Sequence, residues 1–291
     1  MPETKPRSRS DFATVVVLGV LAFTMAAVVH ETVGHGTGCA IEGGRITLLT
    51  STWFRCAGAG SITDMGGTIA SLLFGAMSIA ILSFTRPPPA AGFLLLMFGA
   101  LSLFWGAGQL IIQPLVNRDD LFFVARRMGW DWTWRPVVAV IGIAVYSAAV
   151  RWMIVVARRC PGVTRGAILV AYGTAIVTAA ISGLMWSTEP IPGAIDGFET
   201  LTILPAGLLV AAGAVARGPR EQTVIARSWT WIVFGAAVFA VFLLTQARGL
   251  GTRANVPLHA ATAIDHRTAF ETSDRLTPPS SHHRSPGSAR S

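Results

Sequence analysis

The chain has 291 residues, of which 52% are apolar and 13% are charged. Soluble proteins carry about 25% charged residues, so this composition excludes an ordinary soluble domain and indicates a membrane protein. The formal net charge is +8, and all but one of the basic residues are Arg, gathered in short connections and at both ends. This distribution is typical of topology signals, so we expect the lipid bilayer and no nucleic acid as partner.

A window of about 20 residues, the length that crosses a bilayer, predicts an all-α polytopic fold with about seven transmembrane helices. The apolar run of the first is too long for a signal-peptide core and lacks an Ala-x-Ala cleavage site. Residues 247–291, rich in Pro, Ser, Arg and His, cannot bury a core and are predicted to form a disordered basic tail. The predicted spans are Phe12–Val29, Gly66–Phe84, Ala91–Val116, Pro136–Ala157, Gly166–Trp186, Leu201–Ala216 and Trp229–Thr245.

Arg residues orient these spans, because basic connections near span ends stay in the cytoplasm. By this rule the N-terminal segment, residues 1–11, lies inside the cell, as do three of the basic connections. The connection of residues 117–135 disagrees, since it holds four Arg on the outer side. The sequence thus predicts a multi-pass protein of the cell membrane with a cytoplasmic N-terminus. The acidic connection before the sixth span, which lies outside, holds Glu189, Asp196 and Glu199.

Two of the six histidines flank a glutamate at the end of the first span, in the sequence His30-Glu31-Thr32-Val33-Gly34-His35. Ionisable groups in a membrane span are costly and are usually functional. In the HExxH motif two histidines four residues apart bind one zinc ion, and the glutamate polarises the zinc-bound water. Here the spacing is five residues, which on a regular α-helix separates the two rings by about 140°. A single π-bulge would bring both rings back to nearly the same face of the helix, and Gly34 tolerates such a distortion.

This pattern resembles the HExxGH motif of the dipeptidyl peptidase III family, soluble zinc peptidases, over six residues. A wider resemblance, over about residues 12–130, is to the site-2-protease-like membrane metallopeptidases, the M50 class, whose motif lies on an early transmembrane helix. Gly43–Ile46 looks like the turn and strand that follow in that class, and Gly66–Gly75 is similar to its Gly-rich next span. The third span ends in Gln113–Asp120, where the class places an Asp ligand. The extra residue between the histidines and the lack of a clear Asp-Gly after Pro114 depart from the class pattern.

The resemblance implies a metallopeptidase core in residues 12–135, followed by four further transmembrane helices in residues 136–246. It implies that the chain hydrolyses a peptide bond of a membrane-protein or peptide substrate at or within the membrane. Glu31 would act as general base on a water bound to Zn²⁺. The implied zinc ligands are His30, His35 and one of Asp119 and Asp120.

The topology gives a second reason to join these groups, because the first and third spans both run outward and end at the same membrane face. Polar residues recur every fourth position on the third span and are predicted to support the ligands through hydrogen bonds. These residues are Gln109, Gln113 and Asn117. Alternatively, Asp119 caps a juxtamembrane helix Asp120–Met128 and the glutamines join helices. Asp120 is the preferred ligand, because Asp119 is the better cap.

Residues Arg45–Phe54 are rich in β-branched and aromatic side chains, which predicts a short extramembrane strand or one arm of a hairpin. Its edge would receive an extended substrate by strand addition, and an interfacial plug is the alternative. Cys39 and Cys56 flank this strand on the predicted oxidising side, which favours a disulfide. Metal binding by Cys39 and two free thiols are the alternatives, although Gly36 and Gly38 indicate that the helix ends before Cys39.

Other functions compete with a zinc peptidase. In one alternative, the two histidines lie at the level of the lipid headgroups without a metal. In another they bind haem, but haem binding is disfavoured because no other predicted span contains His. The chain as a whole would then be a non-catalytic membrane scaffold or chaperone with a peptidase-like core, or a small-solute transporter. Spans four to seven hold one intramembrane charge, Arg151, and no inverted repeat, which argues against transport.

Overall fold

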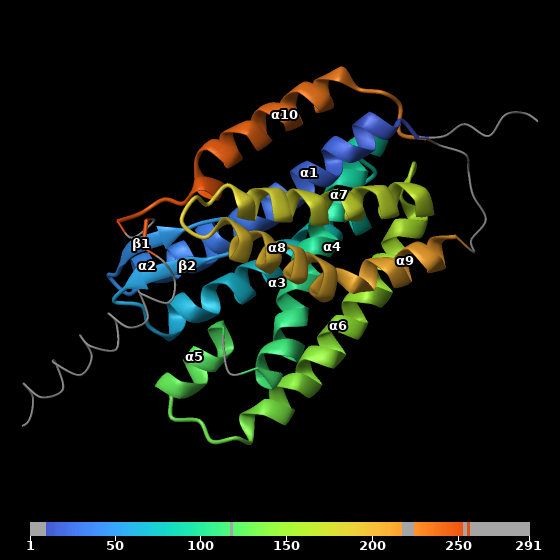
Figure 1. Ribbon diagram of the computed structural model, residues 1–291. Coiled ribbons are helices and arrows are strands. Elements are labelled where there is room, and N and C mark those ends of the chain that lie inside the picture. Colours follow the sequence, from blue (N-terminus) through green and yellow to red (C-terminus); the bar gives the residue numbers. More distant parts are fainter. Residues whose placement is uncertain (1–9, 117–118, 217–223, 253–254, 257–291) are drawn as a thin grey trace, which may run out of the picture. The chain divides into compact units, whose positions relative to one another are not determined.

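The computed structural model describes residues 10–116, 119–216, 224–252 and 255–256 (Figure 1). Within them, seven helical segments are long and apolar enough to cross a membrane, which confirms the predicted all-α polytopic membrane fold. Residues 1–9 of the predicted cytoplasmic segment and most of the predicted tail lie outside the described residues. The seven segments are Phe12–Ile41, Ser61–Phe84, Pro89–Leu115, Trp134–Arg159, Arg165–Leu184, Pro190–Val215 and Trp229–Arg248.

Several spans are built from more than one element. The first span contains α1 (Phe12–Ala27), the π-helix η1 (Val28–His35) and α2 (Gly36–Ile41). The next elements are β1 (Arg45–Leu49), β2 (Phe54–Ala57), α3 (Ser61–Phe84), α4 (Pro89–Ile112), η2 (Gln113–Leu115) and α5 (Asp120–Arg127). The last are α6 (Trp134–Arg159), α7 (Arg165–Leu184), α8 (Pro190–Ile203), η3 (Leu204–Ala206), α9 (Gly207–Val215), α10 (Trp229–Leu244) and η4 (Gln246–Arg248).

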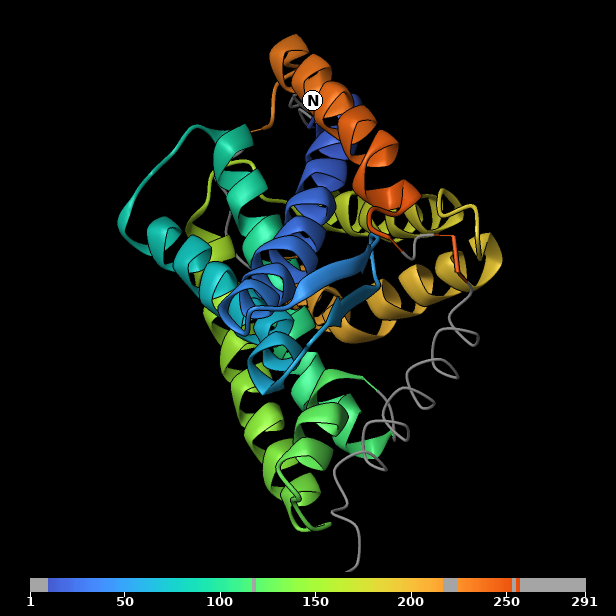
Figure 2. The ribbon, with the colours of Figure 1, turned by 90° about the vertical axis from the view of Figure 1, so that its left-hand side faces the viewer.

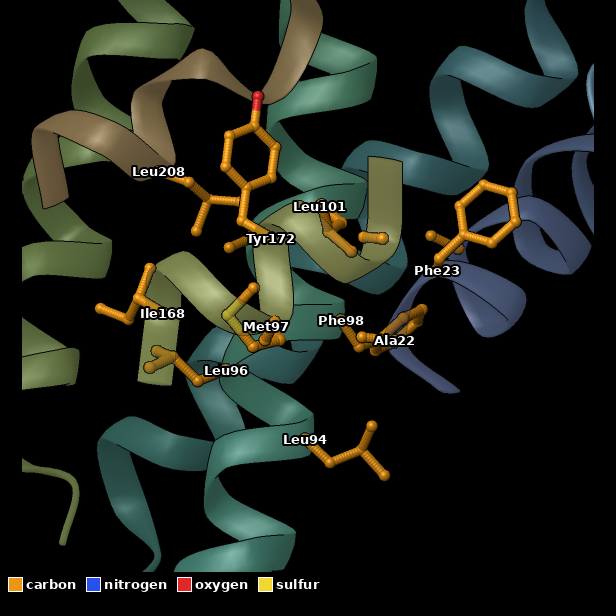
Figure 3. Packing of buried hydrophobic residues seen from close by; sticks show 14 of the residues in the cluster. Ala22, Phe23, Leu94, Leu96, Met97, Phe98, Leu101, Ile168, Tyr172 and Leu208 are labelled. Atoms are coloured by element: carbon orange, nitrogen blue, oxygen red, sulfur yellow. The ribbon is translucent and has the colours of Figure 1, made fainter. Parts of the chain in front are cut away.

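Helix α4 lies at the centre of the bundle and packs against α1, α3 and α6. Its side chains Leu96, Met97 and Leu101 are buried, and Figure 3 shows them beside Ile168 and Tyr172 of α7. Lipid supplies no hydrophobic force that would bring helices together, so close van der Waals packing of this kind holds a membrane bundle. The packing fixes the first span, α3 and α4 against one another, and η1 of the first span, α3 and α4 carry most of the candidate site.

The predicted strand is one arm of an antiparallel hairpin, in which Leu49 of β1 faces Phe54 of β2. A bulge interrupts the register between Ile46 and Leu48. Figure 2 shows the hairpin lying across the ends of the first helices. The outer edge of β1 is partly covered, because Leu49 also pairs with Leu250, which follows the last span.

Two predicted boundaries are wrong. The first span does not end at Gly36 and Gly38 but continues as α2 to Ile41. Gly38 instead lets α2 pack closely on α3, since a Cβ at this position would lie 2.7 Å from the backbone oxygen of Ile62. The sixth span begins at Pro190, a residue suited to the first helical turn, and is kinked at Pro205. Asp196 and Glu199, predicted in an external loop, therefore lie within α8.

Candidate metal centre

The histidine motif lies in a π-helix. Residues Val28–His35 form this element, which is longer than the single bulge predicted. Because hydrogen bonds in a π-helix join residues five apart, His30 and His35 fall on the same side. Their ring centroids are 5.0 Å apart, and the two side chains are 2% and 4% exposed. The five-residue spacing is thus compatible with joint metal binding.

Contact with α3 explains why the π-helix forms here. Gly34 packs directly on Gly66, and a Cβ on Gly34 would lie 2.6 Å from the Gly66 backbone oxygen. The reverse substitution would clash as well, since a Cβ on Gly66 would overlap the Gly34 oxygen. Two glycines let the helix backbones meet, and packing of this closeness offsets the poorer geometry of the π-helix.

The start of α3 is fixed by Glu42, which follows α2. Its carboxylate accepts hydrogen bonds from the backbone N–H groups of Gly60, Ile62 and Thr63, at 2.6, 2.9 and 3.0 Å, and from the Thr63 hydroxyl. Free N–H groups and the helix dipole favour an anion at this end of a helix. Burial acts to raise the pKa of Glu42, but these hydrogen bonds lower it to about 2. The cap holds Thr63 in place beside His35.

Each histidine is oriented by a partner on α3. His35 Nδ1 lies 2.7 Å from the backbone oxygen of Thr63, and His30 Nδ1 lies 2.9 Å from Ser71 Oγ. A carbonyl only accepts hydrogen bonds, so His35 Nδ1 carries the proton and Nε2 keeps its lone pair for a metal. Both rings are also stacked, His30 on Trp105 at 4.7 Å and His35 on Phe54 at 5.4 Å between centroids.

Asp120, the first residue of α5, completes the cluster. Its Oδ2 atom lies 3.6 Å from His35 Nε2, and one ligand atom each from His30, His35 and Asp120 lie within 4.8 Å of one another. In tetrahedral zinc sites with Zn–N distances near 2.0–2.1 Å, neighbouring ligand atoms are about 3.3 Å apart, so the His35–Asp120 pair is close to this spacing and the cluster as a whole would contract on binding an ion. Burial raises the pKa of Asp120 to about 6, against the opposing effect of His35. A bound cation would favour the carboxylate form.

Asp119 does not join the cluster. It occupies the N-cap position of α5 as expected, but no hydrogen bond from its side chain caps the helix. Its φ of 74° and ψ of −179° lie in a region of backbone conformation that residues other than Gly rarely adopt. Its backbone oxygen accepts from the N–H groups of Phe122 and Phe123. Of the two predicted acids, the structure therefore brings Asp120, and not Asp119, together with the two histidines.

Two of the three predicted supporting residues lie beside the ligands. Gln109 accepts a hydrogen bond from Thr68 Oγ1 at 2.8 Å, which turns its amide nitrogen toward His30 Nε2 at 3.4 Å and Asp120 Oδ2 at 3.5 Å. Gln113 accepts from the backbone N–H of Leu121 at 3.0 Å and so holds the start of α5. The third, Asn117, lies outside the described residues.

Gly67 is a site residue that the sequence did not single out. A Cβ there would overlap His35 Nε2 and lie 2.6 Å from His30 Nε2, so the α3 backbone forms one wall of the cluster. The Gly66-Gly67 pair was interpreted only as the small-residue start of a span. Thr63 and Ser71, which orient the rings, were also missed, because Thr and Ser are common helix-packing residues in membranes.

The remaining predicted residues lie close by. Glu31 is buried next to His30 in η1 and is 3% exposed. Cys39 forms a disulfide with Cys56, which ties α2 to β2, so its sulfur is not a metal ligand here. Because β2 also carries Phe54, the disulfide holds the strand that stacks on His35.

No protein-family model, curated protein or solved structure matches this chain. Two imidazole nitrogens and one carboxylate oxygen form a donor set that suits a divalent transition metal. Three protein ligands would leave a fourth position for water, and a carboxyl group stands next to the first ligand in the chain. Such an arrangement is able to activate water for hydrolysis.

Proposed function

We propose that the protein is an integral membrane zinc metallopeptidase, which hydrolyses a peptide bond of a membrane-protein or peptide substrate at or within the membrane. The observation that carries the proposal is the convergence of His30, His35 and Asp120 beside Glu31, although His30 and Asp120 are 90 positions apart in the chain. The described residues contain no other such group of His, Cys, Asp or Glu. Non-haem iron enzymes use the same donor set, but the adjacent Glu31 favours water activation.

The roles follow from the placement of each residue. His30, His35 and Asp120 would hold the ion, and a bound ion would supply the charge that polarises the scissile carbonyl and lowers the pKa of the attacking water. Glu31 takes the proton from that water and passes it to the departing amine. Gln109 directs its amide nitrogen at Asp120 Oδ2 and would steady this ligand, whereas its contact with His30 Nε2 uses the lone pair that the ion would take. Burial of these groups limits competing contact with bulk water.

The proposal includes an orientation in the cell membrane with a cytoplasmic N-terminus. Support comes from the basic connections, and from the disulfide between Cys39 and Cys56, which suits an oxidising compartment outside the cell. The metal centre, near the end of the first span, then lies toward the outer face.

Purified wild-type protein is expected to carry about one zinc ion per chain, as a single mononuclear site requires. The variant His35→Ala should lose it, since removing one of three ligands opens the site. Elemental mass spectrometry of detergent-purified, metal-replete protein measures zinc and iron together. The matched control is His266→Ala, which removes a histidine from the C-terminal segment and should keep the ion. A zinc-free wild type, or equal loss in both variants, would contradict the site.

Cysteine labelling tests the orientation. In intact cells a membrane-impermeant maleimide should label Cys39 and Cys56 only after reduction, whereas Cys160 should react only after permeabilisation. Burial raises the pKa of the Cys160 thiol to about 11, so that step needs long incubation at alkaline pH. The variant Cys160→Ser identifies the signal. Labelling of Cys160 in intact, unreduced cells would invert the topology and place the metal centre toward the cytoplasm.

A further inference from the structure

The seventh span reaches the candidate site through one buried side chain, Gln246, which is 6% exposed. Its Oε1 atom accepts a hydrogen bond from Thr32 Oγ1 at 2.9 Å. Its Nε2 atom donates to the backbone oxygen of Thr50 at 2.9 Å. Both ends of the amide are therefore used, and they bind different parts of the chain.

The two partners of Gln246 belong to the two elements that frame the metal centre. Thr32 is in η1, directly after Glu31. Thr50 follows β1 in the hairpin, whose second strand carries Phe54 against His35. Gln246 thus connects the helix that bears Glu31 with the hairpin that supports a ligand.

Contacts on both sides of Gln246 hold it in this position. Upstream, Phe242 of α10 packs edge-to-face on Phe23 of α1, with ring centroids 6.2 Å apart. Downstream, Leu250 and Leu49 exchange two backbone hydrogen bonds of 2.8 Å. Figure 2 shows α10 beside α1 and the following segment reaching the hairpin. A side chain anchored on both sides loses little further freedom when it bridges two elements.

Physical constraints make such a bridge matter at this place. A π-helix has weaker backbone geometry than an α-helix, so its register depends on outside contacts. Catalysis requires the base to stay within hydrogen-bond reach of the water, and a small displacement costs much of the rate. We infer that Gln246 is a positioning residue, which fixes the Glu31-bearing helix and the hairpin relative to each other. This inference rests on the proposed peptidase function.

The test compares Gln246→Leu, Thr32→Val and the double variant with wild type. The substrate is the membrane protein that accumulates in cells lacking activity. Gln246→Leu should cleave it about tenfold more slowly, which is the loss expected when buried polar groups are left unpaired. Zinc content should stay at the wild-type level. If Gln246 acts through Thr32, the double variant should be no slower than Gln246→Leu alone. Thr245→Val is the matched control, because the Thr245 hydroxyl bonds only to Val241 of its own helix in the structure.

A second measurement does not depend on cleavage. Hydrogen exchange of the purified protein should rise in both the η1 and hairpin segments of Gln246→Leu and stay unchanged in Thr245→Val. The inference would be overturned if Gln246→Leu exchanged hydrogen at the wild-type rate or cleaved at the wild-type rate. It would also be overturned if the rate losses of Gln246→Leu and Thr32→Val multiplied in the double variant. Should Gln246→Leu fail to fold, Thr32→Val alone must show slower cleavage with zinc retained, and full activity there overturns it. If wild type cleaves nothing, the peptidase proposal fails, while exchange still shows whether the bridge exists.

Discussion

Gly67→Ala is expected to empty the zinc site while the seven-span fold stays intact. The new methyl group would overlap His35 Nε2 and lie 2.6 Å from His30 Nε2, in the space that an ion held by both nitrogens needs. The rings have no room to retreat, because His30 is stacked on Trp105 and His35 on Phe54. Mutating a residue that only hydrogen-bonds a ligand typically weakens metal binding by roughly 10- to 100-fold. Displacing a ligand itself should weaken zinc binding by more than that.

Gly173→Ala in α7 is the matched control. A Cβ at Gly173 meets no atom within 4 Å, so this variant should keep its zinc. Its helix should gain stability of up to about 1 kcal/mol, since Ala loses less backbone entropy than Gly. Zinc per chain and thermal unfolding in detergent, with and without a chelator, separate metal loss from misfolding. A Gly67→Ala protein that retains one zinc at wild-type affinity would show that the two Nε2 atoms do not share an ion.

The spans were predictable because apolar length is a local property of the sequence. Seven predicted runs correspond to seven observed helical segments. Charged residues and glycines do not mark the helix ends that the sequence predicts at two places. Asp196 lies inside α8, and Gly38 sits inside a helix because its missing side chain lets α2 approach α3. Whether a glycine ends a helix or packs it depends on a neighbour that the local pattern does not contain.

The joining of His30 and His35 with an acid that follows the third span could be anticipated from motif spacing and from the direction of the spans. That Asp120 and not Asp119 lies beside the histidines depends on the backbone, because the chain adopts a φ of 74° at Asp119 just before α5. The length of the π-helix was not predictable, since it depends on the contact between Gly34 and Gly66. Nor was the link from Gln246 to Thr32, which spans 214 positions.

Glu31→Gln is expected to abolish cleavage while zinc binding and membrane insertion persist, which separates an enzyme from a scaffold. The proposed ligand atoms belong to His30, His35 and Asp120, so the ion should remain. The amide has nearly the shape of the acid and is still able to hydrogen-bond the bound water, yet it cannot take up the proton. General bases typically contribute about 100- to 10,000-fold to rate, and a loss in that range is expected.

The measurement compares membrane proteomes of cells expressing wild type or Glu31→Gln, in which an uncleaved membrane-protein partner should accumulate with the variant. Glu199→Gln is the matched control, because this exposed carboxylate of α8 lies outside the metal cluster. A scaffold that only binds its partner would not respond to the loss of one proton acceptor. Identical proteomes, together with full complementation of a deletion phenotype by Glu31→Gln, would therefore refute the peptidase proposal and favour a scaffold that retains its metal.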